Sequence, residues 1–187
     1  MEKIIIGILT GSLRKDSFSR KIARFLPECM PERFIMVPLE IGGLALYNQD
    51  FDDENCPPLE WMTFREQVSG MDGFVFVTPE YNRSMPAALK NALDIASRPF
   101  GANRWDGKPG AIISVTIGKL GAFGAYHALQ QTLGFLNVHL LQQPEMYLSG
   151  AAELFNDKDE ITNPSTRRFL GDFAKTFSSW VLRMKTN

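Results

Sequence analysis

Hydroxyl side chains gather just after the first apolar run of the chain, where a helical pattern begins. Ser12, Ser17 and Ser19 are accompanied there by Arg14. Because a helix N-terminus exposes unpaired N–H groups with a partial positive charge, this cluster predicts a phosphate site. The simpler alternative is that Asp16, Ser17 or Ser19 only caps the helix, but a cap needs one hydroxyl and does not account for Arg14.

The type of phosphate is narrowed by the patterns that this loop lacks. It has neither the G-x-G-x-x-G of dinucleotide sites nor the G-x-x-x-x-G-K-[ST] of nucleoside-triphosphate sites. A loop rich in hydroxyls instead suits a terminal phosphomonoester, as in flavodoxin-like domains that hold FMN at the first strand–helix turn. We therefore predict that this loop binds a terminal phosphomonoester of the kind that FMN carries.

Two further polar loops follow apolar runs. In residues 78–84, Tyr81 and Asn82 are candidates to flank a flavin ring, although Tyr81 could be a half-buried loop aromatic and Ser84 a helix cap. In residues 118–124, glycines let the backbone approach a planar ligand, and the amides that open the next helix could stabilise negative charge on it. The same glycines could instead only permit tight packing of helix against sheet.

No side chain is predicted to act as a catalytic group. The chain has no G-x-S-x-G or H-E-x-x-H pattern, and its two histidines and two cysteines show no metal-ligand spacing. We therefore expect no metal and no covalent catalysis, and assign the chemistry to the cofactor.

Alternating strands and helices must position these loops. Continuous apolar runs predict buried strands, and amphipathic stretches predict helices. The strands are expected at residues 4–9, 34–38, 73–77, 110–116 and 138–141, with 143–148 extending the edge. Five helices are expected: at about residues 17–29, at 59–71, one that follows Pro86, one that ends at about 136 and one that begins at about 163. With right-handed crossovers this gives one flavodoxin-like domain over residues 1–187, a three-layer α/β/α sandwich around a five-stranded parallel sheet of order 2-1-3-4-5.

The polar loops follow the first, third and fourth of these strands, which are neighbours in that order. The three loops should therefore meet in one crevice at the carboxyl edge of the sheet. Residues 39–58 are expected to form an irregular functional or interface loop, and the Asp52-Asp53-Glu54 run within it is expected to be solvated surface.

Composition and charge limit the partners. The 187 residues, with 44% hydrophobic and 22% charged side chains, suit one globular domain with a sizeable core. A net charge of -1 and a pI near 6.1 argue against nucleic acid or an anionic membrane surface as the main partner. The apolar runs are too short to span a bilayer and no leader pattern precedes the first strand, so we expect a cytoplasmic protein.

An ordered set of short motifs runs through most of the chain. It comprises Gly11-Ser12-Leu13-Arg14-x-x-Ser17, Leu46-Tyr47-Asn48-Gln49-Asp50, Pro79-Glu80-Tyr81-Asn82, the stretch from Asn91 to Pro99, Trp105-x-Gly107-Lys108-Pro109 and Pro144-Glu145. Together these motifs resemble the NADPH-dependent FMN reductase family. That family is flavodoxin-like and includes quinone, azo-dye and chromate reductases.

The resemblance implies non-covalently bound FMN that accepts hydride from NADPH or NADH and passes it on to free flavin, a quinone, an azo compound or chromate by a ping-pong mechanism. The implied cofactor-binding residues are Gly11, Ser12, Arg14, Ser17, Phe18, Ser19, Pro79, Glu80, Tyr81, Asn82, Ser84, Thr116, Gly118 and Gly121. It also implies a homo-oligomer, either a dimer or a tetramer, whose interface could include the aromatic residues Phe51, Trp61, Phe100, Trp105 and Phe123.

Two positions depart from the family pattern. Ser19 stands where relatives often carry Asn, which is a mild change. Relatives often read Gly-Gly-Ala-Arg where this chain has Gly121-Ala122-Phe123-Gly124. The missing arginine affects the expected contacts to the nicotinamide cofactor and to other subunits, so the preference for NADPH over NADH stays open.

Two other functions stay open at this point. A flavodoxin-like electron carrier would shuttle single electrons between proteins and would usually be more acidic than this chain. A non-catalytic FMN-binding module would hold the flavin without turning over any acceptor. Steady-state oxidation of NAD(P)H separates both from a reductase.

Overall fold

A single parallel sheet organises the computed structural model, which describes residues 2–185. Its strands are β1 (Ile4–Thr10), β2 (Phe34–Pro38), β3 (Gly73–Thr78), β4 (Pro109–Val115), β5 (His139–Leu140) and β6 (Met146–Leu148). The order β2-β1-β3-β4-β5 is the one predicted, so the flavodoxin-like fold is confirmed.

The edge beyond β4 is built from two short pieces. β5 pairs with Pro109 and Gly110 at the start of β4, and β6 pairs with residues 113–115 at its end. Both pieces run parallel to β4 on the same side. The predicted edge extension at 143–148 is therefore present as β6, a separate strand that continues the line of β5.

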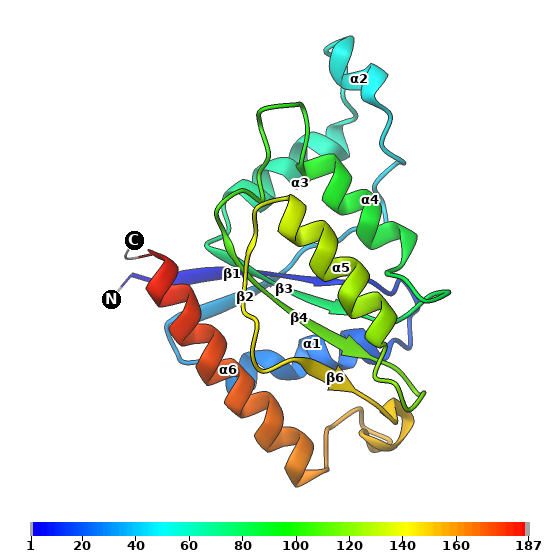
Figure 1. The fold of residues 1–187 in the computed structure, drawn as a ribbon, viewed down its shortest axis with the longest axis vertical. Helices are drawn as coiled ribbons and strands as arrows, with labels where there is room; N and C mark the ends of the chain where they lie inside the picture. Colours follow the sequence, from blue (N-terminus) through cyan, green and yellow to red (C-terminus); the bar gives the residue numbers. More distant parts are fainter. Residues whose placement is uncertain (1, 186–187) are drawn as a thin grey trace.

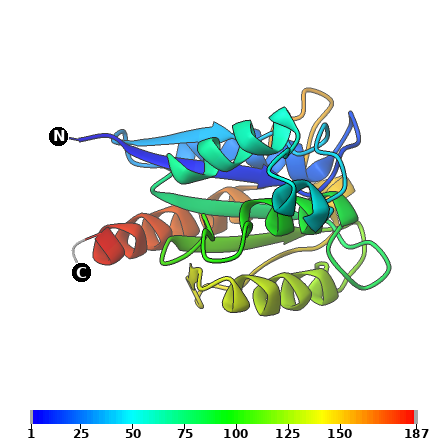
Figure 2. The same cartoon turned by 90° about the horizontal axis from the view of Figure 1, so that it is seen from above.

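Helices cover both faces of the sheet (Figure 1). α1 (Phe18–Cys29) and α6 (Pro164–Lys185) lie on one face, and α3 (Leu59–Ser69), α4 (Ala87–Ala96) and α5 (Phe123–Phe135) lie on the other. Because side chains alternate along a strand, Val75 and Val77 of β3 pack toward α1 and α6, whereas Phe74 and Phe76 pack toward α3, α4 and α5. Both termini lie on one side of the molecule (Figure 2), opposite the carboxyl ends of the central strands.

The segment after β2 differs from the prediction. It contains a short helix, α2 (Gln49–Asp53), which Figure 1 shows projecting from the body of the protein, and the Asn48 side chain caps it by accepting from Asp50 N at 3.1 Å. Asp52 is not solvated surface, because its carboxylate takes two 2.7 Å hydrogen bonds from the Arg65 guanidinium. Both side chains are buried, with 5% of Asp52 and 6% of Arg65 exposed.

Trp61 and Trp105 were suggested as interface residues, but the structure places both in the core. Each is completely buried, and each indole N–H donates to a backbone carbonyl oxygen, from Trp61 to Ala45 and from Trp105 to Leu93. They belong to the core between α3, α4 and the sheet. No helix among residues 2–185 has the length and apolar character needed to cross a membrane.

Candidate functional site

The loops after β1 and β3 are in direct contact. Gly11 N donates to Val77 O at 2.9 Å, which continues the sheet one residue beyond β1. A β-carbon added to Gly11 would lie 3.2 Å from Thr78 Oγ1 and 3.3 Å from Pro79 Cδ. A glycine at this position therefore lets the two loops pack closely.

The loops after β3 and β4 are joined as well. The Glu80 carboxylate accepts from Ala125 N, in the first turn of α5, at 3.1 Å. A β-carbon on Gly124 would lie 2.7 Å from Arg83 O, so these two loops also touch through a glycine. The loop after β3 thus contacts both of the others, and the predicted convergence of the three loops at one edge is confirmed.

The serine hydroxyls after β1 are buried, whereas Arg14 is exposed. Ser12 and Ser17 are each 4% exposed and Ser19 is 1% exposed. Ser17 is the N-cap of α1, with its Oγ accepting from Arg20 N at 3.4 Å, and Ser12 Oγ accepts from Arg14 N at the same distance. Ser17 therefore caps the helix, as the simpler alternative proposed. Capping does not explain why the Ser12 and Ser19 hydroxyls are buried in the same loop.

Ser19 supplies the sharpest test of whether an anion fits this loop. Two buried side-chain oxygens among the described residues have no hydrogen-bond partner, Ser19 Oγ and Tyr47 Oη, and only Ser19 lies in a predicted site loop. A buried hydroxyl without a partner is costly, and an oxyanion would satisfy it. The first turn of α1 contains no acidic residue, and the carboxylate of Asp16, just before the N-cap, is paired with Lys21, so the positive end of the helix is left without a free counter-charge. The residues present thus fit a phosphate.

The N-terminus of α5 is different, because the protein supplies its own anion. The N-cap Ala122 has a left-handed backbone (φ 60°) and no side-chain cap, and the Glu80 carboxylate fills that role from the neighbouring loop. Gly121 packs tightly, since an added β-carbon would lie 2.6 Å from Tyr147 Cβ. Close packing therefore accounts for Gly121 and Gly124. Position 124 also has no room for the arginine of the family pattern.

Tyr81 and Ser84 close a two-residue hairpin. Tyr81 N donates to Ser84 O at 2.9 Å and Ser84 N returns a bond to Tyr81 O at 3.0 Å, with Asn82 and Arg83 both at positive φ (51° and 66°). This is the geometry of a type I′ turn. Ser84 is therefore a hairpin residue and does not cap α4, whose N-cap is Pro86.

The hairpin borders a hollow of about 560 Å³ that faces α5. Tyr81, Asn82 and Ser84 line it together with Ala128 and Thr132 of α5. Tyr81 is 45% exposed, so its ring is available at the surface. Tyr81 and Asn82, which were predicted to flank the flavin ring, therefore share one concave surface.

The remaining predicted residues lie at the margins of the site. Thr116 is half-buried and Gly118 is exposed, and Gly118 N donates to Thr116 Oγ1 at 3.3 Å. Phe18 is half-buried and its ring stacks against Phe155 at 5.9 Å between centroids. Phe18 therefore contacts the segment that follows β6.

Two basic residues beside the serines were missed at the sequence level. Arg20 Nε donates to Ser12 O at 3.5 Å, and Lys21 Nζ lies 2.7 Å from carboxylate oxygens of both Asp16 and Asp159. The hydrogen bonds that Lys21 donates to Asp159 and Asp16 raise the pKa of Lys21, and the bond from Lys21 lowers the pKa of Asp16. Their spacing could have identified them, because residues one helical turn after Ser17 lie on the same side of the helix as Ser17.

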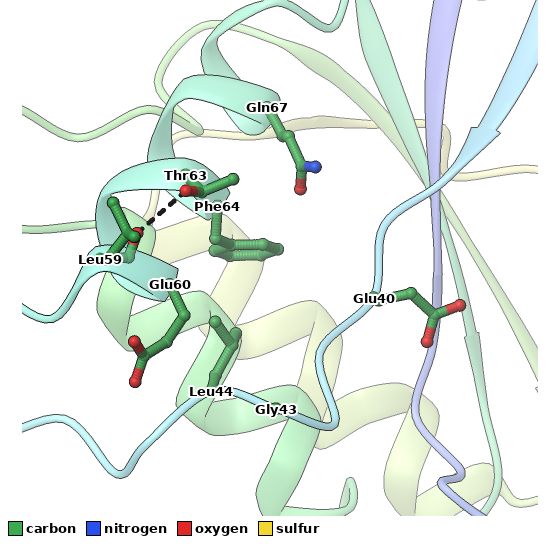
Figure 3. A pocket seen from close by; sticks show the side chains of 8 residues that line it. All are labelled: Glu40, Gly43, Leu44, Leu59, Glu60, Thr63, Phe64 and Gln67. Atoms are coloured by element: carbon green, nitrogen blue, oxygen red, sulfur yellow. Dashed lines mark hydrogen bonds between the residues drawn. The ribbon is translucent and has the colours of Figure 1, made fainter.

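A second hollow lies away from the three loops (Figure 3). It has a volume of about 440 Å³ and lies between α3 and the segment after β2, where Leu44, Glu60 and Phe64 line it. No predicted site residue borders this hollow. Within residues 2–185 there is also no group of three or more His, Cys, Asp or Glu side chains arranged to hold a metal ion.

Comparison with known proteins gives consistent matches along the chain. Residues 4–153 match the family model of the NADPH-dependent FMN reductases. A quinone reductase of Pseudomonas putida is 49% identical, covering 94% of each chain, and a 2-hydroxy-1,4-benzoquinone reductase of a Burkholderia species is 42% identical, covering 94% of this chain and 95% of its own. Among solved structures, FerB, a flavoenzyme NAD(P)H:(acceptor) oxidoreductase from Paracoccus denitrificans, superimposes with a TM-score of 0.90 at 33% identity, covering 97% of this chain and 98% of FerB.

Proposed function

The chain belongs to the NADPH-dependent FMN reductase family, and on this premise we propose that it is a flavoprotein reductase that transfers electrons from NAD(P)H to a quinone by a ping-pong mechanism. Three features support the proposal. The loops after β1, β3 and β4 meet at one edge, the loop after β1 fits a phosphate, and relatives are named for quinone reduction.

The loop after β1 would hold the FMN phosphate. Ser12, Ser17 and Ser19 would donate their hydroxyl protons to its oxygens, and Arg14 would fold onto it from the surface. The N–H groups of the first turn of α1 would add the attraction of the helix dipole. The observation that carries this assignment is the Ser19 hydroxyl, which is buried and lacks a partner within the protein.

The other two loops would position the flavin ring. Pro79, Tyr81 and Asn82 would lie along one side of it, and Thr116 and Gly118 would border it from the loop after β4. When bound, FMN supplies a ring that can take a hydride from NAD(P)H and return two electrons to an oxidised acceptor. The protein would contribute placement and exclusion of water, with the donor and then the acceptor occupying the same surface in turn.

No protein acid or base is needed at the hydride-transfer step. Glu80 is the carboxylate of the loop after β3. It already accepts hydrogen bonds from Ala125 N at 3.1 Å and from Arg83 Nη1 at 3.3 Å. A quinone that accepts a hydride needs one further proton to become a hydroquinone, and at an open site this proton can come from solvent. We therefore assign Glu80 to structure and not to catalysis.

The decisive experiment is the visible absorption spectrum of purified protein supplied with FMN. We expect a bound-flavin spectrum that NAD(P)H bleaches and that a quinone restores. Initial rates measured at several concentrations of both substrates should give parallel double-reciprocal lines. A flavin spectrum without NAD(P)H oxidation would indicate an electron carrier or a binding module, and failure to bind FMN would contradict the proposal outright.

A homo-oligomer in the cytoplasm is part of the same proposal. Phe51, Phe100 and Phe123 are 39%, 92% and 54% exposed, and so could be covered by another subunit. Sedimentation of the FMN-loaded protein should then give a mass of two or four chains. A single-chain mass would contradict this part alone.

A further inference from the structure

We propose that Lys21 is a positioning residue for the phosphate of FMN, because it ties the loop after β1 to the segment between β6 and α6 and neutralises Asp16 beside the serine cluster. The inference rests on the proposed function, since it takes FMN as the ligand of that loop. It concerns a residue outside the set predicted to touch the cofactor.

Lys21 joins two segments that are far apart in the sequence. Its Nζ lies 2.7 Å from Asp16 Oδ1 and 2.7 Å from Asp159 Oδ1. Asp16 immediately precedes Ser17, the N-cap of α1, and Asp159 lies in the stretch between β6 and α6, drawn in orange in Figure 1. The Lys21 side chain is 12% exposed, whereas those of Asp16 and Asp159 are 75% and 46% exposed. An ammonium group is therefore enclosed where the two segments meet.

An aromatic contact joins the same two segments. The rings of Phe18 and Phe155 stack at 5.9 Å with an interplanar angle of 19°. Lys21 Nζ lies 5.4 Å from the centroid of Phe18 and 5.7 Å from that of Phe155, within the range of cation–π attraction. The charged and aromatic contacts thus converge on Lys21, one helical turn after the N-cap.

The turn that carries Asp159 is itself well built. Asn156 Oδ1 accepts from Lys158 N at 2.9 Å and from Glu160 N at 3.0 Å, and Phe155 pairs with Ile161 in an isolated antiparallel bridge. Asp159 adopts a left-handed backbone with φ 62° within this turn. The turn therefore fixes the backbone from which the Asp159 carboxylate reaches Lys21.

Charge explains why the contact should matter to an anion. The Asp16 carboxylate is next in sequence to Ser17, so without a cation it would repel a phosphate at the start of α1. Lys21 compensates that carboxylate and also restrains the loop against the turn at 155–161. Replacing Lys21 by an uncharged residue removes both effects, and the loss should depend on the phosphate and not on the flavin ring.

The test compares FMN with riboflavin, which has the same ring but no phosphate. Affinities of apoprotein for both flavins would be measured by flavin fluorescence quenching, for wild type and for Lys21→Met, Lys21→Arg and Asp159→Asn. The matched control is Lys185→Met, which removes a 2.7 Å ion pair with Asp72 just before β3, at the opposite edge of the sheet. Thermal unfolding of each apoprotein is recorded in parallel.

For Lys21→Met we expect FMN affinity to fall about tenfold, with riboflavin affinity changed less than twofold. Lys21→Arg should retain most of the FMN affinity, Asp159→Asn should lose about threefold, and Lys185→Met should lose none. An unchanged FMN affinity in both Lys21→Met and Asp159→Asn, or an equal loss for FMN and riboflavin, would overturn the inference while leaving the proposed function intact. Absence of FMN binding in the wild type would overturn both.

Discussion

Two helix N-termini face the same edge of the sheet, and they are completed in different ways. At α5, which follows β4, the Glu80 carboxylate from the neighbouring loop accepts from Ala125 N. At α1, which follows β1, the first turn contains no acidic side chain, and its one hydroxyl, Ser19 Oγ, is buried without a partner.

From this difference we propose which of the two helix starts binds a ligand. A helix start has the same need for negative charge in both places. Where the protein meets that need internally, as at α5, the junction is held by the protein itself. Where it does not, as at α1, we propose a site for an external anion. The comparison leads to variants that should convert one kind of junction into the other.

The largest effect is expected from Ser19→Asp, which gives α1 an internal anion like that of α5. The new carboxylate would occupy the place of the phosphate and repel it, so FMN affinity should fall about 100-fold, or about 2.7 kcal/mol. Apoprotein stability should hold, because a carboxylate in the first turn favours the helix. Ser19→Asn is the neutral control of similar size, and fluorescence titration with FMN measures both. If Ser19→Asp bound FMN as well as Ser19→Asn does, α1 would not be the anion site.

The next effect concerns Arg14, the arginine of the loop before α1. Arg14→Ala should weaken FMN binding by about 1.5–3 kcal/mol, the range for a hydrogen bond to a charged group. The FMN affinity of Arg14→Lys should lie between those of wild type and Arg14→Ala, since an ammonium keeps the charge but cannot form the two parallel hydrogen bonds of a guanidinium. Equal FMN retention by wild type and Arg14→Ala in equilibrium dialysis would remove Arg14 from the phosphate site.

At α5 the expected effect falls on stability and not on phosphate binding. Glu80→Ala leaves Ala125 N–H without its partner, and the free energy of unfolding should drop by about 1–3 kcal/mol. Glu80→Gln keeps an acceptor and loses only the charge, so it should cost about 0.3–1 kcal/mol. Urea unfolding of the apoproteins measures both. A selective loss of FMN over riboflavin affinity in Glu80→Ala would show that the two junctions are not as distinct as described.

The smallest effect tests the contact between loops at α5. Gly124→Ala should destabilise the protein by about 1 kcal/mol, because the new β-carbon would lie 2.7 Å from Arg83 O. Gly134→Ala in the same helix has nothing within 4 Å of the new β-carbon and should stabilise by about 0.5–1 kcal/mol. Opposite signs in thermal unfolding support the close approach, whereas stabilisation by both substitutions would contradict it.

The architecture was readable from the sequence because it depends on local patterns. The apolar run from Ile4 to Leu9 and the all-buried β3 need both faces covered, which only a parallel sheet with helices on each side provides. Strand order then follows from short right-handed crossovers. The meeting of the three polar loops is a consequence of that order and was predicted correctly.

The roles of several charged residues could not be predicted from the sequence, because they depend on partners that are distant in the chain. Asp52 looks like surface until Arg65 is placed beside it, and Lys21 looks like an exposed helical lysine until Asp159 is placed above it. Glu80 could be recognised as the anion of α5 only once the start of that helix lay next to the hairpin. In each case the burial of a charge is set by tertiary contact and not by its neighbours in sequence.

The most direct measurement is a crystal structure of the protein grown with FMN. We expect phosphate oxygens within hydrogen-bond distance of the Ser12, Ser17 and Ser19 hydroxyls, with Glu80 still accepting from Ala125 N. A phosphate found at the start of α5, or a serine loop closed on its own side chains while FMN binds elsewhere, would contradict it.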